Sequence, residues 1–159
     1  MVFEWIRKFL GSLEPKQESN NEGILIEAIE NELKIINSIF LSILDRYSNN
    51  FGYAIKNYHD GELFLGGDVK TDELEVEDLN VLKPNIITLA NLTKGNVSEK
   101  NSVQFKAMYE SAKIIKSNLN YTVTELNKKR KINEFKIFES IKEIRENLTI
   151  INSNFRDLN

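Results

Sequence analysis

The chain has 159 residues, no cysteine and a formal net charge of −3 at pH 7. This length predicts one domain, and a composition of 41% hydrophobic and 28% charged residues is that of a globular protein rather than a disordered one. The lack of cysteine excludes disulfides, thiolate metal sites and cysteine nucleophiles. The acidic balance argues against a nucleic-acid-binding protein, and no apolar run reaches membrane-spanning length.

Residues 1–13, MVFEWIRKFLGSL, predict a short amphipathic helix, because apolar residues recur every three or four positions. Arg7 and Lys8 interrupt the apolar core that a secretory signal needs. Such a helix suits a membrane surface, with Trp5 at the interface, or the groove of its own bundle or of another protein. The candidate membrane or partner contacts are Phe3, Trp5, Ile6, Arg7, Lys8, Phe9, Leu10 and Leu13.

Residues 14–21, EPKQESNN, are polar and aperiodic, which predicts a flexible tether before a helical domain at 22–159. Ser19 and Glu22 are spaced as in a capping box, which predicts the start of a helix. Apolar residues then follow a 3,4 spacing typical of a coiled-coil seam, with further apolar residues beside it, so this helix should pack against two neighbours. The seam residues are Ile26, Ile29, Leu33, Ile36, Phe40, Ile43 and Tyr47.

Residues 52–97 are expected to form an acidic connector that lies against the more basic helices that follow it, either within one molecule or between two. An Asp-Gly pair between short apolar segments favours a small β-hairpin at 52–67, with an irregular loop as the alternative. Two short helical segments should come next, separated by Pro84, and Gly95 should close the second one as a C-cap.

Residues 98–158 contain no glycine or proline and predict either one long helix or a hairpin of two helices. Two seams of 3,4 spacing lie on either side of the basic run 128–131 and are displaced from each other by one residue. The first seam is Phe105, Met108, Ala112, Ile115, Leu119, Thr122 and Leu126, and the second is Ile137, Ile141, Ile144, Leu148, Ile151, Phe155 and Leu158. Usual helix lengths favour the hairpin. The predicted fold is therefore mostly α, a three- or four-helix bundle with long heptad-bearing helices.

Residues suited to catalysis or metal binding are few. His59 is the only imidazole and precedes Asp60 in a predicted turn, but no G-x-S-x-G motif accompanies it. A di-metal carboxylate centre needs Glu-x-x-His pairs, and Lys56 stands where that glutamate would be. Counted from Asp68, the acidic stretch lacks the glycine and glutamate of a calcium loop. We predict no catalytic, cofactor-binding or metal-binding residue.

The sequence favours a non-enzymatic helical interaction or scaffold protein of the cytoplasm. Its expected partner is another protein or a further copy of itself in a homo-oligomer, with peripheral attachment to a membrane through residues 1–13. One alternative is a nucleic-acid or anion binder, although no stacking aromatics or helix-turn-helix pattern support it. The contacts of such an anion binder would be Lys128, Lys129, Arg130 and Lys131. A second alternative is an enzyme with a site near His59.

Overall fold

The computed structural model describes residues 18–47, 76–95, 97–128 and 133–158. Within these ranges the protein is a bundle of four helices without a β-strand, which confirms the predicted helical bundle. The β-hairpin predicted at 52–67 and the amphipathic helix predicted at 1–13 lie outside the described residues. The helices are α2 (Glu18–Tyr47), α4 (Val76–Thr93), α5 (Glu99–Leu126) and α6 (Glu134–Arg156).

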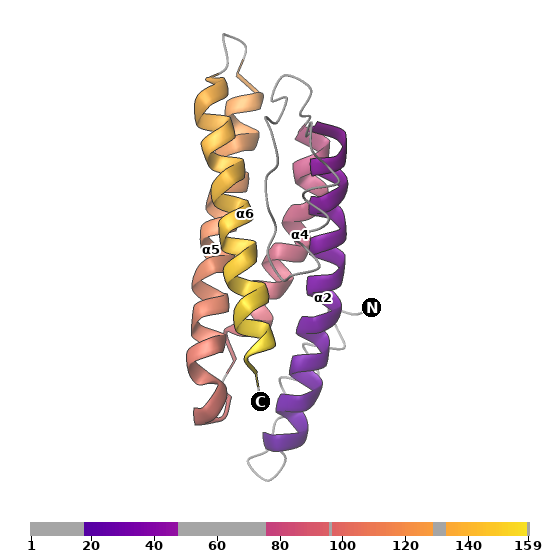
Figure 1. The fold of residues 1–159 in the computed structure, drawn as a ribbon, viewed down its shortest axis with the longest axis vertical. Helices are drawn as coiled ribbons and strands as arrows, with labels where there is room; N and C mark the ends of the chain where they lie inside the picture. Colours follow the sequence, from indigo (N-terminus) through magenta and orange to yellow (C-terminus); the bar gives the residue numbers. More distant parts are fainter. Residues whose placement is uncertain (1–17, 48–75, 96, 129–132, 159) are drawn as a thin grey trace.

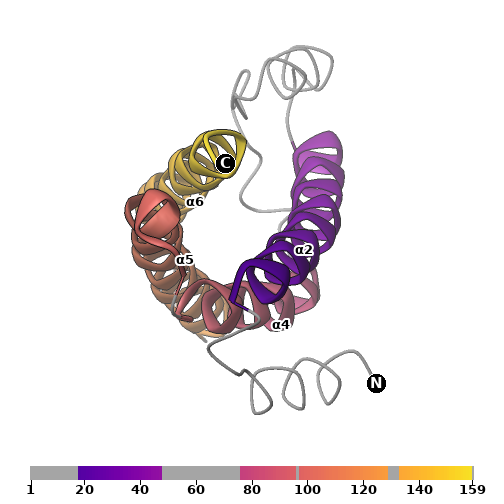
Figure 2. The ribbon, with the colours of Figure 1, turned by 90° about the horizontal axis from the view of Figure 1, so that it is seen from below.

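Successive helices run in opposite directions, and their ends meet in pairs (Figure 1). Viewed from one end, the helices follow an arc in the order α2, α4, α5 and α6 (Figure 2). α4 packs between α2 and α5, and α6 packs along α5, whereas α2 and α6 touch over a short stretch only. At that stretch the side-chain amides of Asn37 and Asn152 bond to each other in both directions, at 2.9 and 3.1 Å.

The core is built from the predicted seams. Apolar side chains three and four residues apart point inward from each helix, and this spacing is what lets a 3.6-residue helix present one continuous apolar face. Fully buried side chains from all four helices meet there, so each helix is held mainly by apolar burial. They include Ile29 and Ile36 of α2, Leu82 and Ile86 of α4, Met108 and Ile115 of α5, and Leu148 and Ile151 of α6.

The chain from 98 to 158 forms two helices rather than one. The phase shift between the two seams coincides with the turn that reverses the chain. Asn133 caps α6, because its side-chain oxygen accepts a hydrogen bond from the Lys136 N–H at 3.2 Å. The buried carboxylate of Glu125 accepts the Asn133 N–H at 2.9 Å and so ties the end of α5 to the start of α6.

The prediction that Pro84 separates two short helices is wrong, because α4 continues through it. A proline inside a helix costs about 3 kcal/mol, since it removes one hydrogen bond and crowds the preceding turn. Leu82 and Ile86 are fully buried on either side of Pro84, and each such side chain stabilises by about 1.5–3 kcal/mol. The burial of both flanking turns therefore outweighs the break. Asn85 also donates its side-chain amide to the Val81 carbonyl at 3.3 Å.

The start of α2 also differs from the prediction. The helix begins at Glu18, so residues 18–21, expected within the tether, are helical. Glu22 does not complete a capping box at this end, because its carboxylate binds Ser98 at the start of α5. Gly95 was expected to act as a C-cap, but its backbone is not in the left-handed conformation that favours glycine at such a position. A Cβ added at Gly95 would meet Leu25 at 3.7 Å, which is an ordinary van der Waals distance.

Candidate protein-interaction surface

The candidate interaction surface is the outer face of the α5–α6 hairpin. The two helices of this hairpin are joined by hydrogen bonds of buried hydroxyl groups. Ser140 Oγ lies 2.8 Å from Asn118 Oδ1, and Thr122 Oγ1 lies 2.9 Å from Ser140 Oγ. Ser140 and Thr122 are both buried, and a buried hydroxyl is tolerated when it has such partners. These bonds fix the register of the two helices along their common axis and place Asn118 directly beside Ser140.

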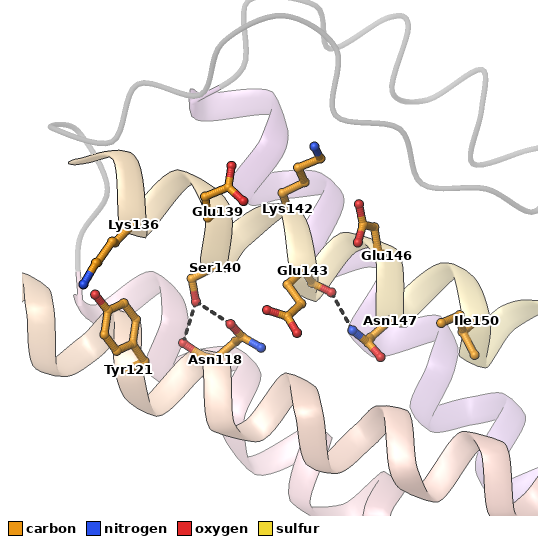
Figure 3. A pocket seen from close by; sticks show the side chains of 10 residues that line it. All are labelled: Asn118, Tyr121, Lys136, Glu139, Ser140, Lys142, Glu143, Glu146, Asn147 and Ile150. Atoms are coloured by element: carbon orange, nitrogen blue, oxygen red, sulfur yellow. Dashed lines mark hydrogen bonds between the residues drawn. The ribbon is translucent and has the colours of Figure 1, made fainter. Parts of the chain in front are cut away.

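A shallow groove of about 440 Å³ runs over this network between the outer sides of α5 and α6. Tyr121 and Lys136 lie at one end of the groove and Ile150 at the other, while Glu143 points into the space between the helices (Figure 3). The remaining lining residues are Asn118, Glu139, Ser140, Lys142, Glu146 and Asn147. Amide, carboxylate, ammonium and apolar groups thus share a surface that is open on one side.

Exposed apolar side chains gather on the same hairpin. In the described part of the chain, six large apolar side chains are exposed, and four of them belong to α5 or α6. Val103, Ile114 and Tyr121 are 11 and 7 residues apart, close to three and two whole turns, so they form one stripe along the outer side of α5. Ile150 of α6 is 44% exposed and lines the groove beside this stripe.

The two helices of the hairpin differ in the charges they expose. Glu139, Glu143 and Glu146 follow one another along α6 at spacings of four and three residues, and all three are exposed. Glu139 and Glu146 lie on the side of α6 turned away from α5 (Figure 3). On α5 the ammonium of Lys113 is exposed, 3.2 Å from Glu110 and 4.7 Å from the centre of the Tyr109 ring. The row of three glutamates therefore belongs to α6, where Lys136 and Lys142 lie beside it, and Lys113 belongs to α5.

The basic run proposed for anion binding is described only at Lys128. The ammonium of Lys128 lies 2.6 Å from the carboxylate of Glu125 and is thus engaged within the hairpin. Hydrogen bonding to Lys128, together with the bond from the Asn133 N–H, holds the pKa of the Glu125 carboxyl below its ordinary value. The other three members, Lys129, Arg130 and Lys131, lie outside the described residues.

Two further sets of predicted residues, the membrane or partner contacts between Phe3 and Leu13 and the site near His59, lie outside the described residues. Among the residues that are described, no group of three or more histidines, aspartates or glutamates is arranged to hold a metal ion. No helix in these ranges is long and apolar enough to cross a membrane.

Sequence reasoning did not single out the groove residues. The available signal was the seven-residue interval between Ile114 and Tyr121, two apolar residues that lie off the predicted seam of α5.

No family model matches the chain, and no curated protein or solved structure is significantly similar to it.

Proposed function

We propose that this protein is a non-enzymatic interaction protein that binds protein partners through the outer face of the α5–α6 hairpin. The observation that carries the proposal is the gathering of Val103, Ile114, Tyr121 and Ile150 on one exposed face of a bundle whose inner seams are already filled. Exposed apolar side chains that cluster beside charged ones are typical of protein interaction sites, and a tyrosine among them is a frequent anchor.

The charges around this face favour a protein partner over a nucleic acid. On α6 three glutamates line the groove beside Lys136 and Lys142, so the groove has no excess of positive charge to attract phosphates. Lys128, the described member of the basic run, already has Glu125 as its partner. A face that carries charges of both signs beside exposed apolar groups suits a complementary protein surface.

The proposed function is tested by placing a photo-reactive benzoylphenylalanine at position 150 of the full-length protein in cells. Illumination should give discrete covalent protein adducts, and Ile114→Asp in the same chain should abolish them. The control is the same group at Val81, which is 57% exposed on α4 and lies away from the hairpin. If position 150 gives no more adduct than position 81, the face is not an interaction site.

We further propose that the N-terminal segment attaches this interaction protein peripherally to a membrane, at its cytoplasmic face. The support is the sequence pattern of residues 1–13, with apolar residues on one side and Arg7 and Lys8 available for anionic head groups. Full-length protein should sediment with vesicles that contain phosphatidylserine. Ile6→Asp with Phe9→Asp should abolish sedimentation, whereas Ile35→Asp, on an exposed position of α2, should not. Equal sedimentation of all three proteins would refute the attachment.

A further inference from the structure

We propose that the α5–α6 face binds the same face of a second copy of this chain, with α5 of each copy lying on α6 of the other. The two-fold axis would then run parallel to the helices. This inference rests on the proposed function, because it names the partner of the same face. The residues of α5 and α6 that share a level along the hairpin decide which side chains of the two copies would meet.

The bond between Asn118 and Ser140 sets these levels. Below that level lie the N-terminal part of α5 and the C-terminal part of α6. Each residue further along either helix lies about 1.5 Å lower, which is the axial rise of an α-helix. A two-fold axis parallel to the helices keeps every residue at its own level while it exchanges the two sides. A residue of α5 therefore meets the residue of α6 that lies at the same level in the second copy.

The apolar groups interlock in this arrangement. Ile150 lies about 15 Å below the Asn118–Ser140 level, between Ile114 at about 6 Å and Val103 at about 22 Å. Ile150 of the second copy would thus insert between these two exposed side chains of α5. Two residues of α5 lie between them on the same stripe: Ala107, whose small side chain leaves room for the isoleucine, and Glu110, which is paired with Lys113.

The charges agree with the same axis. Lys113 lies about 7.5 Å and Glu146 about 9 Å below the Asn118–Ser140 level, so the two side chains would stand opposite each other between copies. Both are half-exposed in the single copy, where each has one neighbouring ionic partner on its own helix. The other two-fold arrangement would place α6 on α6 and α5 on α5, so Lys113 would not stand opposite Glu146.

The available area is sufficient for a stable dimer. α6 has 23 residues and is thus about 35 Å long. Two helices side by side are about 20 Å wide, so the hairpin offers about 700 Å². This is close to the area of about 800 Å² that each partner contributes to a standard interface.

The first experiment measures the mass of the full-length protein by sedimentation velocity over a range of concentrations. The wild type should sediment as a dimer, and Ile150→Asp should raise the dissociation constant by at least about 30-fold while circular dichroism remains unchanged. Val81→Asp, which places the same charge on α4, should sediment as the wild type. A monomeric wild type, or equal effects of the two substitutions, would refute the dimer.

The second experiment tests the axis and uses the lack of cysteine in the chain. Lys113→Cys protein is mixed with a larger, tagged Glu146→Cys protein and oxidised. The expected product is the mixed disulfide, with little disulfide between two copies of either variant. A predominant Lys113→Cys homodimer would instead indicate α5 on α5 and overturn the proposed axis.

The two proposals can fail separately. If the wild type is monomeric and the benzoyl group at position 150 still forms an adduct with a different protein, the dimer is refuted and the interaction face stands. If the group forms no adduct of any kind and the wild type is monomeric, both proposals are refuted.

Discussion

The carboxylate of Glu22, in the first turns of α2, caps the N-terminus of α5 by binding Ser98. Oε1 of Glu22 accepts the backbone N–H of Ser98 at 2.9 Å and its hydroxyl at 2.8 Å. Ser98 is the N-cap residue of α5, yet its own side chain makes no capping bond. The buried amide of Asn101 lies 3.5 Å from the same oxygen. A negative charge at this end is also favoured by the helix dipole.

Glu22→Ala should therefore destabilise the protein by about 1–2 kcal/mol, the usual cost of losing an N-cap. Glu22→Gln keeps an acceptor oxygen and loses only the charge, so it should cost about 0.3–1 kcal/mol. Urea unfolding followed by circular dichroism measures both, and Glu27→Ala, at an exposed position of the same helix, is the control. If Glu22→Ala and Glu27→Ala have equal effects, the contact between the helices does not stabilise the fold.

The reciprocal amide pair of Asn37 and Asn152 provides a second test, at the place where α2 meets α6. Asn37 is 4% exposed, so Asn37→Ala would leave the Asn152 oxygen without its donor and should cost about 1–3 kcal/mol. Replacing both residues by leucine removes both polar groups and should cost less than Asn37→Ala alone. A double-mutant cycle with Asn152→Ala should give a coupling free energy of about 0.5–3 kcal/mol. Strictly additive single effects would show that the pair contributes nothing as a pair.

The core of this fold could be predicted from sequence, because a long seam of apolar residues at 3,4 spacing indicates the buried face of a helix. Ile29, Leu33, Ile36, Phe40 and Ile43 all lie on the seam predicted for α2, and all are buried. The end of α5 differs in detail. Leu126 was expected on the seam but is only half-buried, whereas its neighbour Glu125 is buried. The reason is the bond from Glu125 to Asn133 across the turn, which apolar periodicity does not reveal.

The failures of sequence reasoning have one origin, since each depends on partners distant in the chain. The local effect of Pro84 on the helix predicts a break there. Only the burial of Leu82 and Ile86 explains why α4 continues. Glu22 was assigned to its own helix end, because a contact 76 residues away leaves no local pattern. The exposed apolar side chains on the outer face of the α5–α6 hairpin were missed for the same reason. Whether Ile114 faces the core or solvent depends on where the other helices pack.

Glu125 makes the stability of the hairpin depend on pH. Its pKa is lowered in the folded protein, chiefly by the hydrogen bond to Lys128, so its contribution is present above the ordinary glutamate pKa. The contribution is lost as the pH falls through the lowered, folded-state value. Glu125→Gln should therefore be less stable than the wild type near pH 7, and the difference should shrink below about pH 4.5.

Urea unfolding of both proteins between about pH 7 and about pH 3 measures this difference. The matched control is Glu110→Gln, which removes an exposed ion pair with Lys113 and should change stability little at any pH. A difference between the wild type and Glu125→Gln that stays constant down to about pH 3 would contradict the role given to this carboxylate.

Gly23 offers a substitution that should stabilise the protein. It lies inside α2, and an added Cβ would have no heavy atom within 4 Å, so alanine fits without steric conflict. Glycine inside a helix costs about 0.5–1 kcal/mol relative to alanine, because the unfolded chain loses more freedom on folding. Gly23→Ala should raise the free energy of unfolding by that amount in urea. Ser38→Ala, at an exposed position of the same helix, should give a smaller gain. An unchanged or lower stability of Gly23→Ala would indicate that the first turns of α2 are not helical in solution.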